Sequence, residues 1–216
     1  MPTRTTDAAR TPRKPTRSEK AEANRQALLR AAAELVGEVG YEATSIARIT
    51  ERAGLAQGTF YRHFESRQAM FDMLLPNMGE DLLASLRDRV HGASDILDVE
   101  EKGFRGFFEF VERHPGFYRI LNEAEIAAPK AFDYHIQNLA KHYVGALKRS
   151  HQRSQLPGFE ERELEVIAYI LMAARFYIYL RFAKSDAGVG AIPDWVVRAY
   201  MKFVAGGLNF GKDAAD

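Results

Sequence analysis

The segment 44–64, TSIARITERAGLAQGTFYRHF, constrains the fold more than any other part of this chain. Its first half has apolar residues at helical spacing, and the hydroxyl of Thr44 is placed to cap that helix. Gly54 follows, where the chain must leave the helix through a left-handed turn that only glycine enters cheaply. Phe60 and Phe64 then give a second helix an inward face. Two short helices joined by a tight turn containing glycine form a helix-turn-helix unit.

The second helix of this unit carries side chains suited to DNA. It is expected to span residues 56–63 and presents Gln57, Gly58, Thr59, Tyr61, Arg62 and His63 on its other faces. Gln57 can pair bidentately with adenine, Thr59 can contact a thymine methyl group or a phosphate, and Arg62 can reach guanine or phosphate. Tyr61 and His63 suit donation to phosphates, which positions the helix without selecting a sequence. The alternative for Tyr61 and His63 is packing against the first helix of the unit.

The order and spacing of these residues resemble the DNA-binding domain of the TetR family of bacterial transcriptional regulators. The similarity covers about residues 22–72 and rests on Gly40-Tyr41-x-x-Thr44-Ser45-Ile46, Ile49, Ala53-Gly54, Gly58-Thr59-Phe60-Tyr61-x-His63-Phe64 and Ser66-Arg67. The resemblance implies contacts with the DNA backbone from Thr44, Ser45, Tyr61, His63 and Arg67. Thr50 departs from the family pattern, where an alanine is usual, and so does Arg48, where an acidic residue is common. Arg48 is a candidate phosphate contact on its chemistry alone.

Hydrophobic periodicity predicts an all-α protein with two folded parts. An N-terminal DNA-binding domain of three helices is expected over residues 18–66, with Ser18 capping its first helix and Ser66 capping the helix that follows it. The resemblance implies a larger helical domain for ligand binding and dimerisation over residues 67–216. Pro76 falls in the helix that joins the two domains, where it should kink or break the helix, at a cost of ~3 kcal/mol if the helix continues. We expect a bent linker helix that resumes over residues 80–90. No segment alternates at period two for long, so no sheet is expected.

Residues 1–17 are predicted to form a disordered basic tail. They contain Arg4, Arg10, Arg13, Lys14 and Arg17 against a single acidic residue, Asp7. Too little apolar surface is present for this segment to fold alone. Two interpretations stay open, a solubilising leader or a basic arm that lies along phosphates or enters the minor groove.

Composition and motifs exclude several classes of protein. The chain has no cysteine, so disulfides and thiolate metal sites are excluded, which suits a reducing cytoplasm. The longest apolar run, 166–174, is stopped by Arg175, and no membrane span is expected. Phosphate-binding loops, nucleophile elbows and zinc-protease motifs are missing, so we expect neither an enzyme nor a bound cofactor. His135, Asn138 and His142 share one stripe of a helix but lack a third ligand, so they predict an exposed polar face rather than a metal site.

The two C-terminal helices, expected over residues 163–184 and 192–210, carry stripes typical of a homodimer interface. The first stripe consists of Val166, Ile170, Ala173, Tyr177, Leu180 and Lys184. The second consists of Trp195, Val196, Tyr200, Val204, Gly207 and Leu208. Two copies of the DNA-binding domain in adjacent major grooves would double the contacts and explain a palindromic operator.

Aromatic residues fill the middle of the chain, and they form either the core or the wall of a ligand cavity. The candidate lining residues are Phe104, Phe108, Tyr118, Tyr134, Tyr143, Arg175 and Tyr179. Arg175 lies within an apolar helix, so it needs an acidic partner or an anionic ligand. An ion pair with Glu123, with Glu125 or with a second subunit is the favoured interpretation, ahead of a ligand carboxylate or phosphate.

Together these features predict a cytoplasmic, ligand-responsive regulator of transcription, expected to be a repressor that binds double-stranded operator DNA as a homodimer. A small hydrophobic effector, an acyl or aromatic acid or its thioester, would move the helix that begins after Ser66 and release the DNA. The alternative is an architectural DNA-binding protein without an effector, although DNA binding alone would not require the large aromatic domain. A helical enzyme with an accidental helix-turn-helix is a weaker rival.

Overall fold

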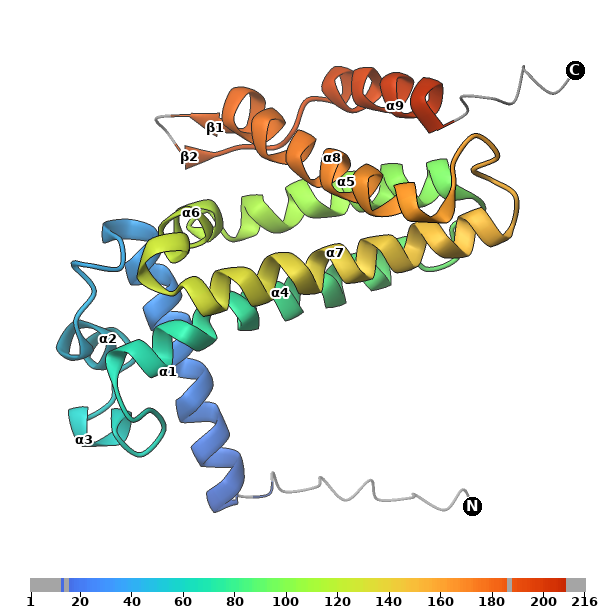
Figure 1. The fold of residues 1–216 in the computed structure, drawn as a ribbon. Coiled ribbons are helices and arrows are strands. Elements are labelled where there is room, and N and C mark those ends of the chain that lie inside the picture. The colour runs from blue at the N-terminus through green and yellow to red at the C-terminus, as the bar shows by residue number, and fades with distance from the viewer. Residues whose placement is uncertain (1–12, 14–15, 186–187, 209–216) are drawn as a thin grey trace, which may run out of the picture.

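The computed structural model describes residues 13, 16–185 and 188–208, and this part of the chain is almost entirely helical (Figure 1). The all-α class predicted from periodicity is therefore confirmed. The basic tail predicted for residues 1–17 lies outside the described residues except at positions 13, 16 and 17. At that edge Arg13 forms an exposed ion pair with Glu19, with 3.0 Å between Nη2 and Oε1.

The N-terminal domain consists of α1 (Arg17–Val39), α2 (Ile46–Arg52) and α3 (Gln57–Phe60). Thr16, rather than the predicted Ser18, caps α1. The Thr16 hydroxyl accepts from the Glu19 backbone N–H, and the Glu19 carboxylate accepts from the Thr16 N–H. Gly40 ends the helix with a φ of 85°, a conformation that favours glycine. The inner faces of the three helices share a buried core that includes Leu35, Ile49 and Phe60.

The helix that joins the two domains, α4 (Arg67–Val90), is continuous through Pro76, so the break considered for this position does not occur. Ser66 caps this helix as predicted, accepting the Ala69 N–H at 3.0 Å. The buried residues on either side of the proline are Leu74, Leu75, Met78 and Leu82. Burial of each such side chain contributes roughly 1.5–3 kcal/mol, so together they outweigh the ~3 kcal/mol that the proline costs.

The larger domain continues with α5 (Ile96–Arg113), α6 (Phe117–Ala127), α7 (Pro129–Gln152), α8 (Leu164–Ile178) and α9 (Asp194–Leu208). A 3₁₀ turn (Glu161–Glu163) precedes α8, and a π turn (Tyr179–Ala183) extends it. The end predicted for α9 at residue 210 lies outside the described residues. The prediction of no sheet is wrong in one place, since β1 (Lys184–Ser185) and β2 (Gly188–Val189) pair as antiparallel strands. Strands of two residues are too short for alternation to reveal.

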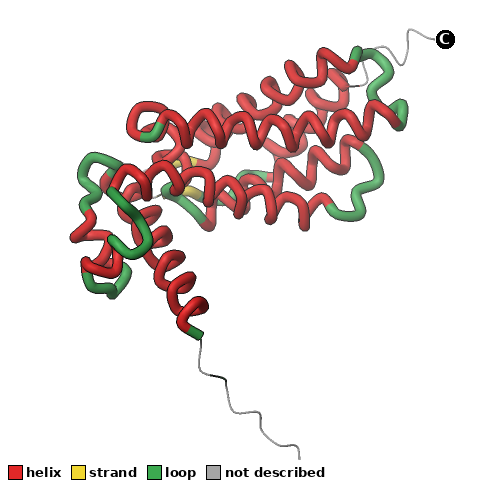
Figure 2. Tube along the Cα trace, turned by 60° about the horizontal axis from the view of Figure 1, so that its bottom comes forward, coloured by secondary structure: helices red, strands yellow, loops and turns green. Residues whose placement is uncertain are grey.

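The helices of the larger domain lie side by side along its length, with the N-terminal domain at one end (Figure 1). Figure 2 shows the same arrangement from a second direction. Helix α4 packs against α5 and α7, α7 packs against α8, and α5 packs against α9. Helix α6 lies at the end nearest the N-terminal domain and contacts α1 as well as α4 and α7. Both α4 and α6 therefore connect the two domains.

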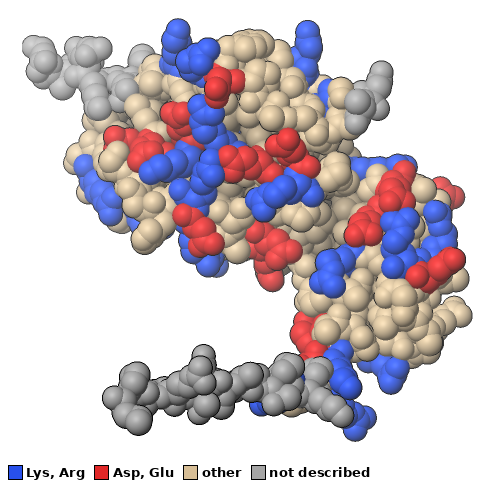
Figure 3. Space-filling model, turned by 180° about the vertical axis from the view of Figure 1, so that it is seen from behind, with Lys and Arg blue, Asp and Glu red and all other residues tan. Residues whose placement is uncertain are grey.

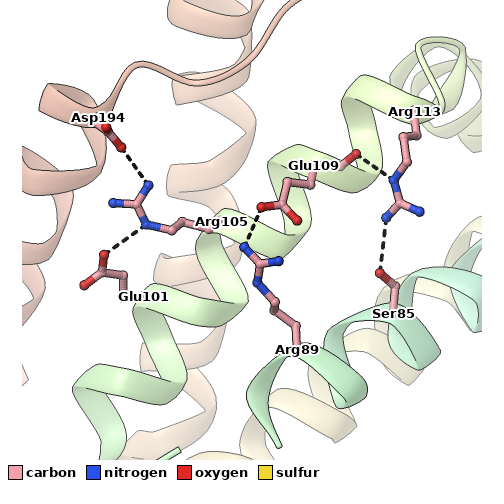
Figure 4. Close-up of polar contacts among 7 residues, drawn as sticks. All are labelled: Ser85, Arg89, Glu101, Arg105, Glu109, Arg113 and Asp194. Carbon is pink, nitrogen blue, oxygen red and sulfur yellow. Dashed lines mark hydrogen bonds and ion pairs between the residues drawn. The ribbon is translucent and has the colours of Figure 1, made fainter.

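Ion pairs along α5 fix the neighbouring helices (Figure 4). Arg105 contacts Glu101 on its own helix at 2.9 Å and Asp194 of α9 at 2.8 Å. Arg89 of α4 reaches Glu109 at 2.5 Å. Acidic and basic side chains are interspersed over the rear face of the molecule (Figure 3). Exposed pairs contribute at most ~1 kcal/mol each, so they orient α4 and α9 rather than supply the main stability.

Candidate DNA-binding surface and ligand cavity

Ser45, and not the predicted Thr44, caps the first helix of the helix-turn-helix unit. The Ser45 hydroxyl is exposed and accepts from the Arg48 N–H at 3.3 Å. Thr44 is completely buried, and its hydroxyl donates to the Gly40 carbonyl at 2.7 Å. A buried hydroxyl cannot reach a phosphate. The Thr44 side chain therefore holds the loop before α2, and only Ser45 of this pair presents its hydroxyl at the surface.

The second helix of the unit is shorter than predicted. Helix α3 ends at Phe60, and the chain continues as a turn through His63. Phe60 and Phe64 are buried as predicted, with ring centroids 5.5 Å apart. The predicted inward face is therefore present, even though the last residues of the segment are not helical.

The open surface of this segment is formed by Gln57, Gly58 and Tyr61. Gln57 and Gly58 are exposed, and a Cβ built on Gly58 would meet nothing within 4 Å. Tyr61 is 57% exposed, with its ring edge-on to the ring of Phe60. His63 is half-buried, so packing and a phosphate contact both stay open for it.

Thr59 and Arg62 contact each other in the free protein. Nη2 of Arg62 donates to the Thr59 hydroxyl at 2.8 Å. Arg62 is exposed, whereas Thr59 is buried. The predicted contact of Thr59 with a thymine methyl group or a phosphate therefore lacks an exposed side chain in the free protein, where the Thr59 hydroxyl accepts from Arg62 instead. Arg62 itself stays available to DNA.

Two further cations border the unit. Arg48 is exposed and donates from Nη1 to the Ala43 carbonyl at 2.7 Å. Arg67 donates to the Thr44 carbonyl at 3.2 Å and lies over the Phe71 ring, 5.4 Å from its centroid. Both keep donors for a phosphate, because a guanidinium group has five N–H bonds.

A cavity of about 690 Å³ lies inside the larger domain, bounded by α4, α5, α6, α7 and α8. Of the predicted residues, the structure places Tyr118, Tyr143 and Arg175 on its wall. Sequence analysis missed the other aromatic residues of the wall, which are Phe107, Phe117, Phe132, Tyr169 and Phe176. A mostly apolar wall with a few polar groups is the usual make-up of a small-molecule site.

Four predicted lining residues do not line this cavity. Phe104, Phe108 and Tyr179 are buried in the surrounding core, and Tyr134 is half exposed. Helices α5 and α7, which carry Phe104, Phe108 and Tyr134, have aromatic residues on more than one stripe. Periodicity identifies the stripes but not the stripe that faces the cavity.

Arg175 is paired with Glu100 of α5, and not with an acidic residue of α6. Nη2 of Arg175 lies 2.8 Å from Oε1 of Glu100, and both side chains are buried. Tyr143 and Tyr200 donate their hydroxyls to the same carboxylate. Burial is the largest single influence on Arg175 and opposes its charge, but the Glu100 carboxylate together with Tyr143 and Tyr200 outweighs it, so the pKa of the guanidinium is raised. Because this charge is neutralised internally, Arg175 needs no ligand anion.

His135 is buried on the cavity wall, which corrects the exposed polar face predicted for this stripe. Burial lowers the pKa of His135 to about 4, so its imidazole is neutral near pH 7. His142 also lines the cavity but is exposed, and its Nδ1 lies 2.8 Å from the Asn138 carbonyl oxygen. Within the described part of the chain, no group of three or more potential metal-ligating side chains is found.

Charged groups of α6 hold the DNA-binding domain beside the cavity. Glu123, one of the predicted partners of Arg175, instead accepts from the Tyr41 N–H and from Nε of Arg119, each at 2.8 Å. Arg119 also donates to the Glu38 carbonyl at 2.6 Å. A Cβ on Gly40 would lie 2.7 Å from the Glu123 carboxylate, so a residue without a side chain is required there. Helix α6 thus contacts the cavity with one face and the end of α1 with another.

The outer surface of α8 and α9 is rich in large apolar side chains. The exposed ones are Val166, Ile170, Tyr177, Trp195 and Phe203, together with Tyr169, which also lines the cavity. On α9 the predicted stripe is mostly wrong, since Val196, Tyr200, Val204 and Leu208 are buried inside the protomer. Helix α9 has two apolar stripes, and the stripe with Val196, Tyr200, Val204 and Leu208 packs into the core of the protomer. Trp195 and Phe203 mark the stripe that stays outside.

By length and composition alone, the stretch Glu161–Ala183 is apolar enough to cross a membrane. Its Arg175 is paired with Glu100, and α8 packs against α7. The packing of this stretch is therefore that of a helix within a helical domain.

Comparison with known proteins identifies the N-terminal domain. Residues 28–74 match the family model for bacterial regulatory proteins of the tetR family. The chain is 27% identical over 188 residues to the HTH-type transcriptional repressor KstR2 of Mycobacterium tuberculosis, which covers 84% of this chain and 91% of that protein. It is 36% identical over 87 residues to the uncharacterized HTH-type transcriptional regulator YvdT of Bacillus subtilis, which covers 40% of this chain and 45% of that protein.

Solved structures agree with the two-domain fold. The structure of the ketosteroid transcriptional regulator KstR2 of Mycobacterium tuberculosis has a TM-score of 0.60 and 26% identity, covering 85% of this chain and 94% of that chain. The fatty acid degradation regulator FadR of Bacillus halodurans has a TM-score of 0.67, covers 87% of this chain and 95% of that chain, and at 17% identity shows the fold alone. The resemblance stated from the helix-turn-helix motif is therefore confirmed.

Proposed function

We propose that this chain, which belongs to the TetR family of bacterial transcriptional regulators, is a ligand-responsive repressor that binds palindromic operator DNA as a homodimer. The observation that carries this proposal is the double role of α6. Its residues Tyr118 and Leu121 line the cavity, and its residue Glu123 holds the Tyr41 backbone of the DNA-binding domain. A molecule that enters the cavity and displaces α6 therefore displaces the DNA-binding domain.

DNA recognition is assigned to the exposed side chains of the helix-turn-helix unit. Gln57 and Arg62 suit base edges in the major groove. Ser45, Arg48, Tyr61, His63 and Arg67 suit phosphates, with Gly58 allowing close approach of the backbone. In this assignment Thr44 and Thr59 act indirectly, since both are buried.

Assembly as a homodimer is assigned to the exposed apolar side chains of α8 and α9. Val166, Ile170, Trp195 and Phe203 are between 56% and 74% exposed in the described protomer. An exposed patch of this kind on a soluble regulator marks an interface. A two-fold pair places two recognition helices on one operator, which accounts for a palindrome.

The effector is proposed to be small and mostly hydrophobic, such as an acyl or aromatic acid or its thioester. The wall of the cavity is mostly apolar, and Arg175 is already neutralised by Glu100. Arg87 and Arg149 also line the cavity, are exposed, and form no ion pair with the described residues. These two arginines are the groups suited to an acid or thioester headgroup near the surface.

Release of DNA requires that the effector bind one conformation better than the other. A tenfold loss of operator affinity needs only ~1.4 kcal/mol of coupling. Helices α4 and α6 both reach from the cavity to the DNA-binding domain, so displacement of either changes the spacing of the two recognition helices. This action takes place in the cytoplasm, where the operator lies.

Selection of binding sites from random DNA tests the proposal. The selected sites should contain two inverted half-sites, and the full-length protein should bind them as a dimer in a gel shift. A hydrophobic extract of the host's metabolites should release this complex. Selection of unrelated sequences, with binding that the extract does not change, would favour the architectural protein without an effector.

A further inference from the structure

His135 is, with Tyr118, one of the two buried polar side chains of the cavity wall that make no hydrogen bond to the residues that the structure describes. It is 3% exposed and lines the cavity between α4 and α7. Its ring makes no hydrogen bond to any of the residues that the structure describes, and burial is the one influence on its pKa. Buried polar groups are hydrogen-bonded in the great majority of cases, so an exception calls for an explanation.

One edge of the His135 ring lies against the backbone of α4 at Gly79. A Cβ built on Gly79 would lie 2.4 Å from Nδ1 and 2.9 Å from Cε1 of His135. That edge of the imidazole therefore lies directly against the Gly79 backbone. The ring of Phe117 borders it at 6.0 Å between centroids, in an edge-to-face arrangement. Nε2 is the ring nitrogen that stays clear of the Gly79 contact.

The charges around His135 decide the kind of group that it can bind. Its imidazole is neutral near pH 7, because burial lowers its pKa to about 4. The buried cation of the cavity, Arg175, is neutralised by Glu100. A carboxylate or ammonium placed beside His135 would thus be buried without an opposite charge, which is strongly unfavourable.

Resting on the proposed effector cavity, we propose that Nε2 of His135 binds an uncharged oxygen of the effector, a hydroxyl or a carbonyl. The site then takes a mostly apolar molecule with a neutral oxygen at its buried end, and any acidic headgroup lies towards the exposed Arg87 and Arg149. A neutral imidazole can serve either kind of oxygen, since one nitrogen donates and the other accepts. An effector without this oxygen would leave the imidazole unpaired and bind more weakly.

Two fluorescent probes that differ by one hydroxyl test this assignment. Pyrene and 1-hydroxypyrene, which is neutral at pH 7, are titrated into the full-length dimer. We expect 1-hydroxypyrene to bind roughly three- to tenfold more tightly than pyrene, the range of one net hydrogen bond. In His135→Phe the preference should vanish while pyrene still binds, which shows that the cavity is intact. His135→Gln, which keeps a hydrogen-bonding group, should restore part of the preference.

The matched control is His91→Phe, an exposed histidine at the C-terminal end of α4 that does not line the cavity. It should keep the preference for 1-hydroxypyrene. If His135→Phe loses pyrene as well, His135→Leu is measured in its place. A preference that survives in a variant without a hydrogen-bonding group at position 135, or no preference in the wild type, overturns the role of His135 while the cavity proposal stands. Failure of both probes to bind the wild type overturns the inference together with the cavity proposal.

Discussion

The carboxylate of Glu123 lies 2.8 Å from the backbone nitrogen of Tyr41, so a side chain of the larger domain holds the residue that directly follows Gly40 at the end of α1. The two residues are 82 positions apart in the chain. Arg119 pairs with the same carboxylate and donates to the Glu38 carbonyl. These contacts join α6, whose Tyr118 and Leu121 line the cavity, to the DNA-binding domain.

Loss of that link should uncouple the two domains. Glu123→Ala leaves the Tyr41 N–H without its acceptor and should cost about 1–3 kcal/mol of unfolding free energy. We expect operator binding to persist while release by effector weakens, measured by thermal unfolding and gel shift. Glu112→Ala, an exposed acidic residue of α5, serves as the control. Normal release by effector in Glu123→Ala would count against α6 as the coupling element.

The Glu123 contact should also depend on pH. Burial raises the pKa of Glu123, but hydrogen bonds from Arg119 and Tyr41 outweigh it, so the net pKa is lowered from 4.5. A carboxylate with a lowered pKa stabilises the folded state above its unfolded pKa, and this stability is lost as pH falls through the folded value. The difference in unfolding free energy between wild type and Glu123→Ala should therefore be largest near pH 7 and shrink below about pH 4.5. Chemical denaturation across this range measures it, and a constant difference would contradict the ionic contribution.

On the DNA side, Tyr61→Ala and Gln57→Ala should have different effects. Tyr61→Ala removes the proposed contact with the DNA backbone and should weaken binding to all sequences alike. Gln57→Ala should change the preference at one position of each half-site, by ~1–3 kcal/mol. Both residues are exposed, so the thermal stability of the protein should not change. Gel shifts on operator variants separate the two effects, and unchanged affinity in both variants would refute the assigned surface.

Substitutions at two neighbouring residues of α9, Phe203 and Val204, should affect dimer assembly and protomer folding separately. Phe203 is 74% exposed in the protomer, so Phe203→Glu should leave the fold intact but place a charge in the dimer interface and give monomers. Val204 is 2% exposed, so Val204→Glu should instead destabilise the protomer itself. Sedimentation and thermal unfolding are measured on both variants. A dimeric Phe203→Glu at micromolar concentration would place the interface elsewhere.

The stability of the protein should depend strongly on keeping both partners of the buried pair Arg175 and Glu100, or neither. Arg175→Met leaves the Glu100 carboxylate buried and unpaired, at a cost of ~3–5 kcal/mol. The double variant Glu100→Gln/Arg175→Met removes both charges and should recover most of this loss. Calorimetry of the single and double variants tests the expectation. Equal stability of the two variants would mean that the charges are not coupled.

Local patterns were sufficient to predict the helices and the helix-turn-helix unit. The left-handed Gly54, the pair Phe60 and Phe64, and the cap at Ser66 each act over fewer than about five residues, where sequence spacing fixes geometry. Local predictions failed at the end of α3, which stops at Phe60 rather than His63, and where two candidates for one role stood close together. Thr16 and Ser45 cap their helices in place of Ser18 and Thr44.

The tertiary structure decided what covers each face. Periodicity revealed the stripes on α9, but packing against α5 determined that Val204 faces the core and Phe203 faces solvent. The sequence likewise showed that Arg175 needs an acidic partner. The partner is Glu100, 75 positions away, because α5 packs beside Arg175 in the folded protein. His135 became a buried, unpaired group because α4 approaches it at Gly79. The sequence thus determined which residues share a helix face, while only the arrangement of helices in space determined which group each face meets, because those contacts join segments far apart in the chain.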